Sequence, residues 1–261
     1  MRIALGLEYD GGSFHGWQSQ ADGRGAQDAL ERALSQIAGA PISAIAAGRT
    51  DAGAHATLQV VHFDTDALRP DSAWVRGTNA HLPQAMAVRW ALPVGPEFHA
   101  RFAATGRHYT YLLLDRPVRP ALLNGRVGWY HRPLSVEAMC VAARNLLGRH
   151  DFSAFRAAEC QAKSPVKTLD RLDVVREDDV IHFDLHADAY LQHMVRNIVG
   201  AMVCVGSGRQ EPDWMRALLE SCDRTRGAPT FAAAGLYLTG VDYPPRCNLP
   251  PTVVPVRIPR G

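Results

Sequence analysis

The chain has 261 residues, of which 47% are hydrophobic, and its formal net charge is only +2 at pH 7. This composition is that of a globular protein, and no apolar run approaches the roughly 18 residues that a membrane span needs. The five cysteines are odd in number and no pair has metal-ligand spacing, which argues against a disulfide framework and a zinc site. The first residues do not resemble a secretory signal, so we expect a cytoplasmic protein with reduced thiols.

The first part of the chain alternates between strand and helix patterns. Apolar residues at helical spacing predict helices over 26–37, which Gly39 ends, and over 71–80. Alternating or short apolar runs predict strands over 3–9, 42–46, 58–63 and 86–92.

The second part repeats this alternation. A strand is predicted over 107–114, a hairpin from 169–175 and 180–185 turning at 177–179, and a closing strand over 235–241. Helical spacing predicts a helix over 136–147 with Ser135 as its N-cap. A long helix is predicted from about Tyr190, with Asn197 on its polar face.

These patterns predict an α+β protein in which two similar halves each form an antiparallel or mixed sheet flanked by helices. We place an N-terminal domain at 1–104 and a C-terminal domain at 105–244, and expect a cleft between such halves to hold the active site. Residues 245–261 are rich in proline, and we expect them to be an extended or disordered tail that packs poorly.

The charge distribution is uneven. The segment 101–132 holds six arginines, at positions 101, 107, 116, 119, 126 and 132, and a single acid, Asp115. Such a stretch is what a phosphate-facing surface requires, although a solvated face or a genome rich in arginine codons would give the same pattern.

The loop Gly48-Arg49-Thr50-Asp51-Ala52-Gly53 carries the clearest chemical signal. In a locally extended loop Arg49 and Asp51 point the same way, and a nearby guanidinium keeps a carboxylate ionised, as a nucleophile requires. The alternative is an ordinary turn with a surface ion pair.

A second glycine-rich and aromatic cluster spans residues 10–18. It is suited either to a rigid loop that contacts a base or to a packed turn, and its glycines match no phosphate-binding motif. Two histidine-containing sets are candidate metal ligands: His182 with His186 and His193, and Asp51 with His55, His62 and Asp64. Neither set has recognised ligand spacing, so we expect no metal.

Together these segments resemble the tRNA pseudouridine synthase A family, over nearly the whole chain. The segments that carry the resemblance are Tyr9-Asp10-Gly11 with Gly16-Trp17-Gln18, Ala47 to Gly53, His99-Ala100-Arg101-Phe102 with Arg107, Tyr109 and Tyr111, Asp151 to Arg156, His193 to Gly200, and Gly235 to Leu238. Ala54 stands where valine is more usual, and 231–234 lacks a proline often found there.

The resemblance implies the two-domain pseudouridine synthase fold and a homodimer without cofactor or metal. Its substrate would be tRNA, and the reaction would isomerise uridine to pseudouridine in the anticodon stem-loop, at tRNA nucleotides 38, 39 and 40. Asp51 matches the catalytic nucleophile and Arg49 the arginine paired with it. Tyr109 matches a substrate-contacting tyrosine, and Leu236 an aliphatic residue against the uracil.

We further expect Arg101, Arg107 and Arg196 to bind RNA, since phosphate contacts offset the cost of unstacking the target base. Two alternative functions are RNA binding without catalytic activity and metal-dependent hydrolysis that uses Asp51 and His55. The intact Arg49-Thr50-Asp51 loop favours catalysis over binding alone, because binding does not need an ionised carboxylate.

Overall fold

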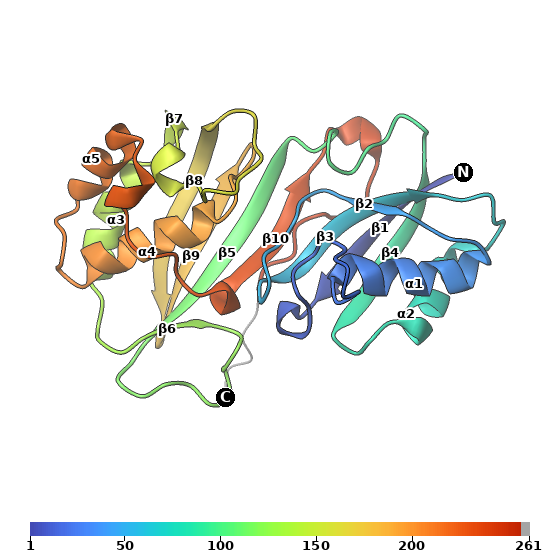
Figure 1. Cartoon of the computed structure of the whole chain (residues 1–261), viewed down its shortest axis with the longest axis horizontal. Helices are drawn as coiled ribbons and strands as arrows, with labels where there is room; N and C mark the ends of the chain where they lie inside the picture. Colours follow the sequence, from blue (N-terminus) through green and yellow to red (C-terminus); the bar gives the residue numbers. More distant parts are fainter. Residues whose placement is uncertain (257–261) are drawn as a thin grey trace. The chain divides into compact units, whose positions relative to one another are not determined.

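The structure is a computed structural model that describes residues 1–256 (Figure 1). The chain forms two compact units: Met1–Thr105 together with the segment from Tyr237 onward, and Gly106–Leu236. Each unit combines helices with an antiparallel or mixed sheet, which confirms the predicted α+β class. Within residues 1–256, no helix has the length and apolar character needed to cross a bilayer.

The sheet of the first unit has the strand order β4-β1-β3-β10, and β2 pairs with β3. Strand β1 is antiparallel to both β3 and β4, whereas β10 runs parallel to β3, with Tyr237 opposite His55. The strands are β1 (Arg2–Tyr9), β2 (Ala44–Ala46), β3 (His55–Asp64), β4 (Met86–Val94) and β10 (Leu236–Asp242).

Helix α1 (Ala26–Ala38) buries its apolar face in this unit, as its spacing predicted. Asp28 accepts a hydrogen bond from the Gly25 N–H at the helix start, and Gly39 ends the helix with φ +74. The second predicted helix is a π-helical turn, Ala73–Gly77, followed by α2 (Thr78–His81). Both helices lie over the same sheet in Figure 1.

The described part of the proline-rich segment packs against this unit, contrary to our expectation. Val253 forms a bridge with Gly240, and the Val254 N–H donates to the carbonyl of Thr239 at 2.8 Å. Thr57 also donates a short hydrogen bond to the Val254 carbonyl. Residues 252–254 contain no proline, so their N–H groups remain available for pairing along β10. Pro259 lies outside the described residues.

The sheet of the second unit has the order β5-β9-β8-β7, with the short strand β6 parallel to β5. The predicted hairpin is formed by β8 and β9, and Asp178 in its turn has φ +53. The strands are β5 (Gly106–Asp115), β6 (Gly128–Tyr130), β7 (Gly148–Asp151), β8 (Val166–Glu177) and β9 (Val180–Ala187).

Three helices pack in this unit: α3 (Val136–Arg144), α4 (Met194–Gly206) and α5 (Trp214–Ser221). Ser135 is the N-cap of α3, as predicted, and accepts a hydrogen bond from the Ala138 N–H at 3.1 Å. Helix α4 begins about four residues later than predicted, because His193 takes the left-handed conformation (φ +62). The placement of Asn197 on a polar face was wrong, since this residue is only 2% exposed.

Candidate active site

The loop that carries Asp51 connects β2 to β3 and is fixed by its own backbone. The Ala54 N–H donates to the Asp51 carbonyl at 3.0 Å, and Gly53 has φ +81, which a residue with a side chain rarely adopts. Gln59 of β3 donates to the carbonyl of Gly48 at 2.7 Å. The Asp51 side chain therefore stands, half-buried, on a defined turn.

A second loop, residues 11–17, packs backbone to backbone against the first. The Trp17 N–H donates to the Thr50 carbonyl at 3.0 Å, and the Gly53 N–H donates to the Gly11 carbonyl at 3.2 Å. A Cβ atom on Gly11 would lie 1.8 Å from the Ala54 carbonyl oxygen, so only glycine fits there. Of the two interpretations of this cluster, the structure shows the packed turn, and the turn braces the Asp51 loop.

Tyr9 supports the same loop from the sheet. Its hydroxyl and the Thr50 hydroxyl lie 2.9 Å apart in a buried hydrogen bond, and its ring packs on Trp17 with centroids 5.8 Å apart. Burial raises the pKa of Tyr9 to about 12, more than the hydrogen bonds from its partners lower it. Tyr9 is thus a neutral hydrogen-bonding group at pH 7.

Two histidines of the candidate metal-ligand sets, His55 and His62, make contacts within the first unit. His55 is buried, its ring stacks on Tyr237 at 4.6 Å, and its Nδ1 lies 3.1 Å from both the Gly11 N–H nitrogen and a carboxylate oxygen of Asp10. His62 accepts a hydrogen bond from the Ala100 N–H. Both residues fix loops of the first unit.

Arg49 lies on the exposed side of its loop, two residues before the half-buried Asp51. An exposed arginine gains little from an ion pair in water, because solvent screens the charges and the long side chain loses freedom. Pairing of Arg49 with Asp51 stays a prediction.

In the second unit, Tyr109 of β5 is 9% exposed and its ring packs edge-on against Tyr190, with centroids 4.9 Å apart. The hydroxyl of Tyr190 is buried and has no hydrogen-bond partner within the described part of the chain. Burial raises the pKa of Tyr190 well above its usual value, so Tyr109 packs against an uncharged phenol.

Leu236 follows a tight turn that is attached to β5. Tyr111 donates from its hydroxyl to the Ala232 carbonyl at 2.7 Å, and Arg196 donates from Nε to the Phe231 carbonyl at 2.8 Å. A Cβ atom on Gly235 would lie 2.4 Å from the Leu112 carbonyl oxygen, which fixes a glycine there. These contacts set the shape of the turn without the proline that the resemblance led us to look for.

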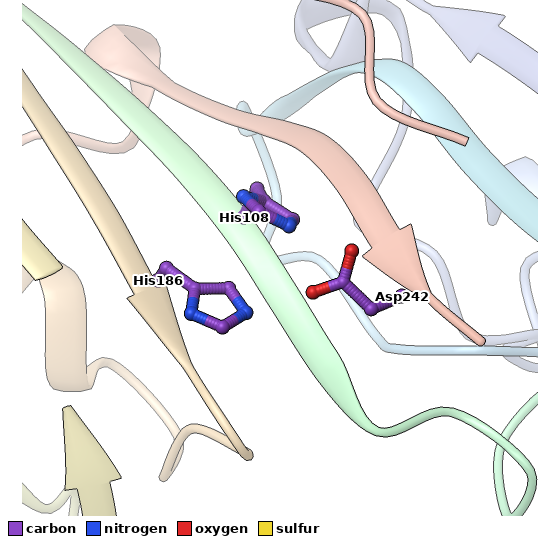
Figure 2. Close-up of side chains that lie close together, drawn as sticks. All are labelled: His108, His186 and Asp242. Carbon is purple, nitrogen blue, oxygen red and sulfur yellow. The ribbon is translucent and has the colours of Figure 1, made fainter. Parts of the chain in front are cut away.

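The arginines proposed for RNA binding differ in their surroundings. Arg196 and Arg107 are both half-buried, and Arg107 donates to the Asp188 carbonyl at 2.9 Å. Next to Arg107, His108 of β5 and His186 of β9 are cross-strand partners with ring centroids 4.4 Å apart (Figure 2). Arg101 is exposed, and its guanidinium lies over the ring of Phe102.

The one acid of the arginine-rich segment, Asp115, is paired with an arginine outside that segment. Asp115 is buried and accepts two hydrogen bonds from Arg176, at 2.6 and 2.7 Å. It also accepts one from the Leu134 N–H at 2.9 Å. The arginines at 119, 126 and 132 are exposed on the surface of this unit.

The family model described as tRNA pseudouridine synthase matches residues 7–103 and 142–244. Similar proteins called tRNA pseudouridine synthase A occur in Chromobacterium violaceum, 62% identical with 96% of each chain covered, and in Dechloromonas aromatica, 59% identical with 96% of this chain and 95% of the relative covered. One from Neisseria meningitidis serogroup B is 58% identical, with 93% and 92% covered.

The chain belongs to the tRNA pseudouridine synthase family. As a member of this pseudouridine synthase family it is an isomerase that acts on tRNA. The matched ranges include the Asp51 loop, the turn that braces it, and Leu236. Tyr109 falls between the two matched ranges, so its role depends on the motif resemblance and on its position in β5.

Proposed function

We propose that this chain isomerises uridine to pseudouridine in the anticodon stem-loop of tRNA, just 3′ of the anticodon, with Asp51 as its catalytic carboxylate. The observation that carries the proposal is the bracing of the Asp51 loop, whose backbone is held by Trp17, Gly11 and Gln59. A catalytic group must be held within a fraction of an ångström of its working position, and such bracing supplies that.

The reaction breaks the N1–C1′ bond, turns the uracil and joins C5 to C1′, with no net redox change. Asp51 has three chemically balanced roles: attack on C1′ as in retaining glycosidases, addition to the uracil ring, or removal of a ribose proton. All three need an ionised carboxylate, beside the ribose for the first and third and beside the base for the second. None needs a redox cofactor, and we propose that the enzyme works without cofactor or metal.

We propose that Tyr109 and Leu236 contact the uracil, because detached uracil must be kept from water until it rejoins the ribose. Both side chains are nearly buried, at 9% and 6% exposed, and both stand on braced backbone. For Arg49 we propose a contact with Asp51 once RNA excludes water, since the attraction between two charges rises as the dielectric constant falls.

We propose that Arg101, Arg107 and Arg196 contribute to tRNA binding. Each direct phosphate contact adds roughly 0.7–0.9 to the slope of log K against log salt concentration. Changing Arg101 or Arg107 to Gln should therefore flatten the slope by about that amount, measured by tRNA binding at several salt concentrations. Arg76→Gln, which removes an exposed charge outside the proposed set, is the matched control. An unchanged slope would remove the residue tested from the interface.

The test of the activity uses tRNA labelled with tritium at uridine C5, incubated with the full chain in EDTA. We expect tritium release by the wild type and by Asp66→Asn, an exposed carboxylate outside the loop, and none by Asp51→Asn. Release by all three would contradict the assignment of Asp51. No release by the wild type, despite tRNA binding, would contradict the proposed reaction.

We also propose that the enzyme is a cytoplasmic homodimer. The loop between β5 and β6 exposes Val118 at 71% and Leu122 at 96%, and apolar side chains of this kind are suited to burial by a second copy. All five cysteines are free thiols, which suits a reducing compartment. Light scattering of the purified chain would test the dimer, and a monomer at micromolar concentration would contradict it.

A further inference from the structure

The ring of Phe102 is 76% exposed although the turn that carries it belongs to the core of the first unit. This turn connects β4 to β5, and its residues Phe98 and Ala100 are 4% and 0% exposed. Large aromatic side chains are usually well buried, so a phenylalanine held in water next to such residues is unusual.

Looseness of the turn does not explain this exposure. The Ala100 N–H donates to Nδ1 of His62 at 3.1 Å, and the hydroxyl of Tyr243 donates to the Ala100 carbonyl at 2.7 Å. The Ala103 N–H donates to the His99 carbonyl at 2.9 Å. The backbone on both sides of Phe102 is therefore anchored to β3 and to the segment after β10, and the ring is held outward by a fixed turn.

One side of the Phe102 ring already carries a flat aromatic neighbour. The His99 ring lies 4.3 Å from it with planes 29° apart, and Nδ1 of His99 accepts hydrogen bonds from the N–H groups of Arg101 and Phe102, both at 3.2 Å. Partial burial lowers the pKa of His99, as do the nearby charges of Arg2 and Arg101, so the ring is neutral at pH 7. The Arg101 guanidinium carbon lies over the Phe102 ring, 5.8 Å from its centroid.

We propose that the Phe102 ring is a stacking platform for an unpaired nucleobase of the tRNA, with Arg101 beside it to meet the phosphate backbone. An aromatic face next to a guanidinium is the combination with which proteins bind unpaired nucleotides, since every base has a π face and every linkage a negative charge. The His99–Phe102 pair extends such a stack, and the fixed turn removes the entropic cost of ordering it. The proposal depends on tRNA being the substrate.

The test compares four variants of the full chain by tRNA affinity and by tritium release. Phe102→Ala and Phe102→Leu both remove the π face, and Leu keeps most of the apolar surface. Phe102→Trp keeps a π face and adds a fluorophore that a stacked base quenches. Leu68→Ala, at an 84% exposed apolar residue of the same unit, is the matched control. Light scattering of each variant without tRNA measures its mass and so reports whether the substitution changes self-association.

We expect Phe102→Ala and Phe102→Leu to raise the Kd for tRNA about tenfold, equivalent to about 1.4 kcal/mol, while Leu68→Ala leaves it unchanged. Phe102→Trp should bind like the wild type and lose fluorescence beyond the change seen in the wild-type protein. An unchanged Kd for Phe102→Ala, or wild-type affinity in Phe102→Leu, would overturn the platform. A fall in mass without tRNA would also overturn it, in favour of a contact between copies of the chain. If the wild type binds tRNA without releasing tritium, the proposed reaction fails while the stacking result still stands.

Discussion

Replacing Gly16 by alanine tests whether the packed turn positions the Asp51 loop. Gly16 has φ +84, where an alanine costs about 1–2 kcal/mol. Its Cβ would also lie 3.1 Å from the Thr50 carbonyl oxygen and 3.2 Å from the Ala52 nitrogen, so the Asp51 loop must move by a few tenths of an ångström. A displacement of 1 Å costs roughly a hundredfold in rate, and we expect kcat to fall about tenfold here.

The control is Gly39→Ala, because Gly39 has φ +74 and nothing lies within 4 Å of the Cβ it would gain. The two variants share the backbone strain, and only Gly16→Ala presses on the Asp51 loop. We expect both to lower the melting temperature by a few degrees, at about 2–4 °C per kcal/mol, and only Gly16→Ala to lower kcat in the tritium-release assay. Equal kcat values in the two variants would refute positioning of Asp51 through this contact.

Three further predictions concern stability. Burial lowers the pKa of His62 to about 4, so the contribution of the neutral imidazole to the free energy of unfolding is complete above pH 6.5 and is lost as the pH falls towards 4. Urea unfolding of the wild type should therefore show a loss of about 3 kcal/mol at acid pH that His62→Gln does not show. Burial raises the pKa of Tyr9 to about 12, so the wild type should lose about 2 kcal/mol more than Tyr9→Phe between pH 10 and pH 12, as the tyrosine ionises more readily in the unfolded chain. Asn197→Ala should cost about 2–4 kcal/mol in urea unfolding, whereas the exposed Asn124→Ala should cost under about 0.5, and equal values would contradict a hydrogen-bonding role for Asn197.

The sequence predicted most elements because their signals are local. Ser135 and Gly39 mark helix ends through hydrogen bonds or dihedral angles within a few residues of themselves, and both predictions were confirmed. The start of α4 was predicted too early, because apolar spacing continues through Leu191 whereas the left-handed His193 interrupts the helix. The spacing of apolar residues predicts which side chains are buried, but it does not predict the backbone dihedral angle of a single residue.

The remaining errors involve partners that are distant in the chain. The helical pattern predicts that Asn197 faces solvent. In the structure its amide donates to the Phe155 carbonyl and accepts from Arg224 and Thr230. A buried amide is tolerated only when such partners exist, and helical spacing does not reveal them. The packing of residues 252–254 along β10 likewise depends on pairing between separate segments.

The candidate site shows the same division between local and distant signals. Asp51 could be singled out from its loop alone, whereas the bracing by Gly11 and Gly16 depends on approach distances that no spacing rule contains. Arg49 was expected beside Asp51 because alternate residues of an extended segment share a side. The loop turns at Ala52 and Gly53 and Arg49 is exposed, so the pairing of the two side chains stays a prediction.

Mapping pseudouridine at single-nucleotide resolution in treated tRNA tests the central claim most directly. Unmodified tRNA would be incubated with the wild type or with Asp51→Asn, and pseudouridines located by carbodiimide adducts that stop reverse transcription. We expect stops just 3′ of the anticodon with the wild type and none with the variant. Stops only at other positions, or the same stops with Asp51→Asn, would contradict the proposed substrate site or the role of Asp51.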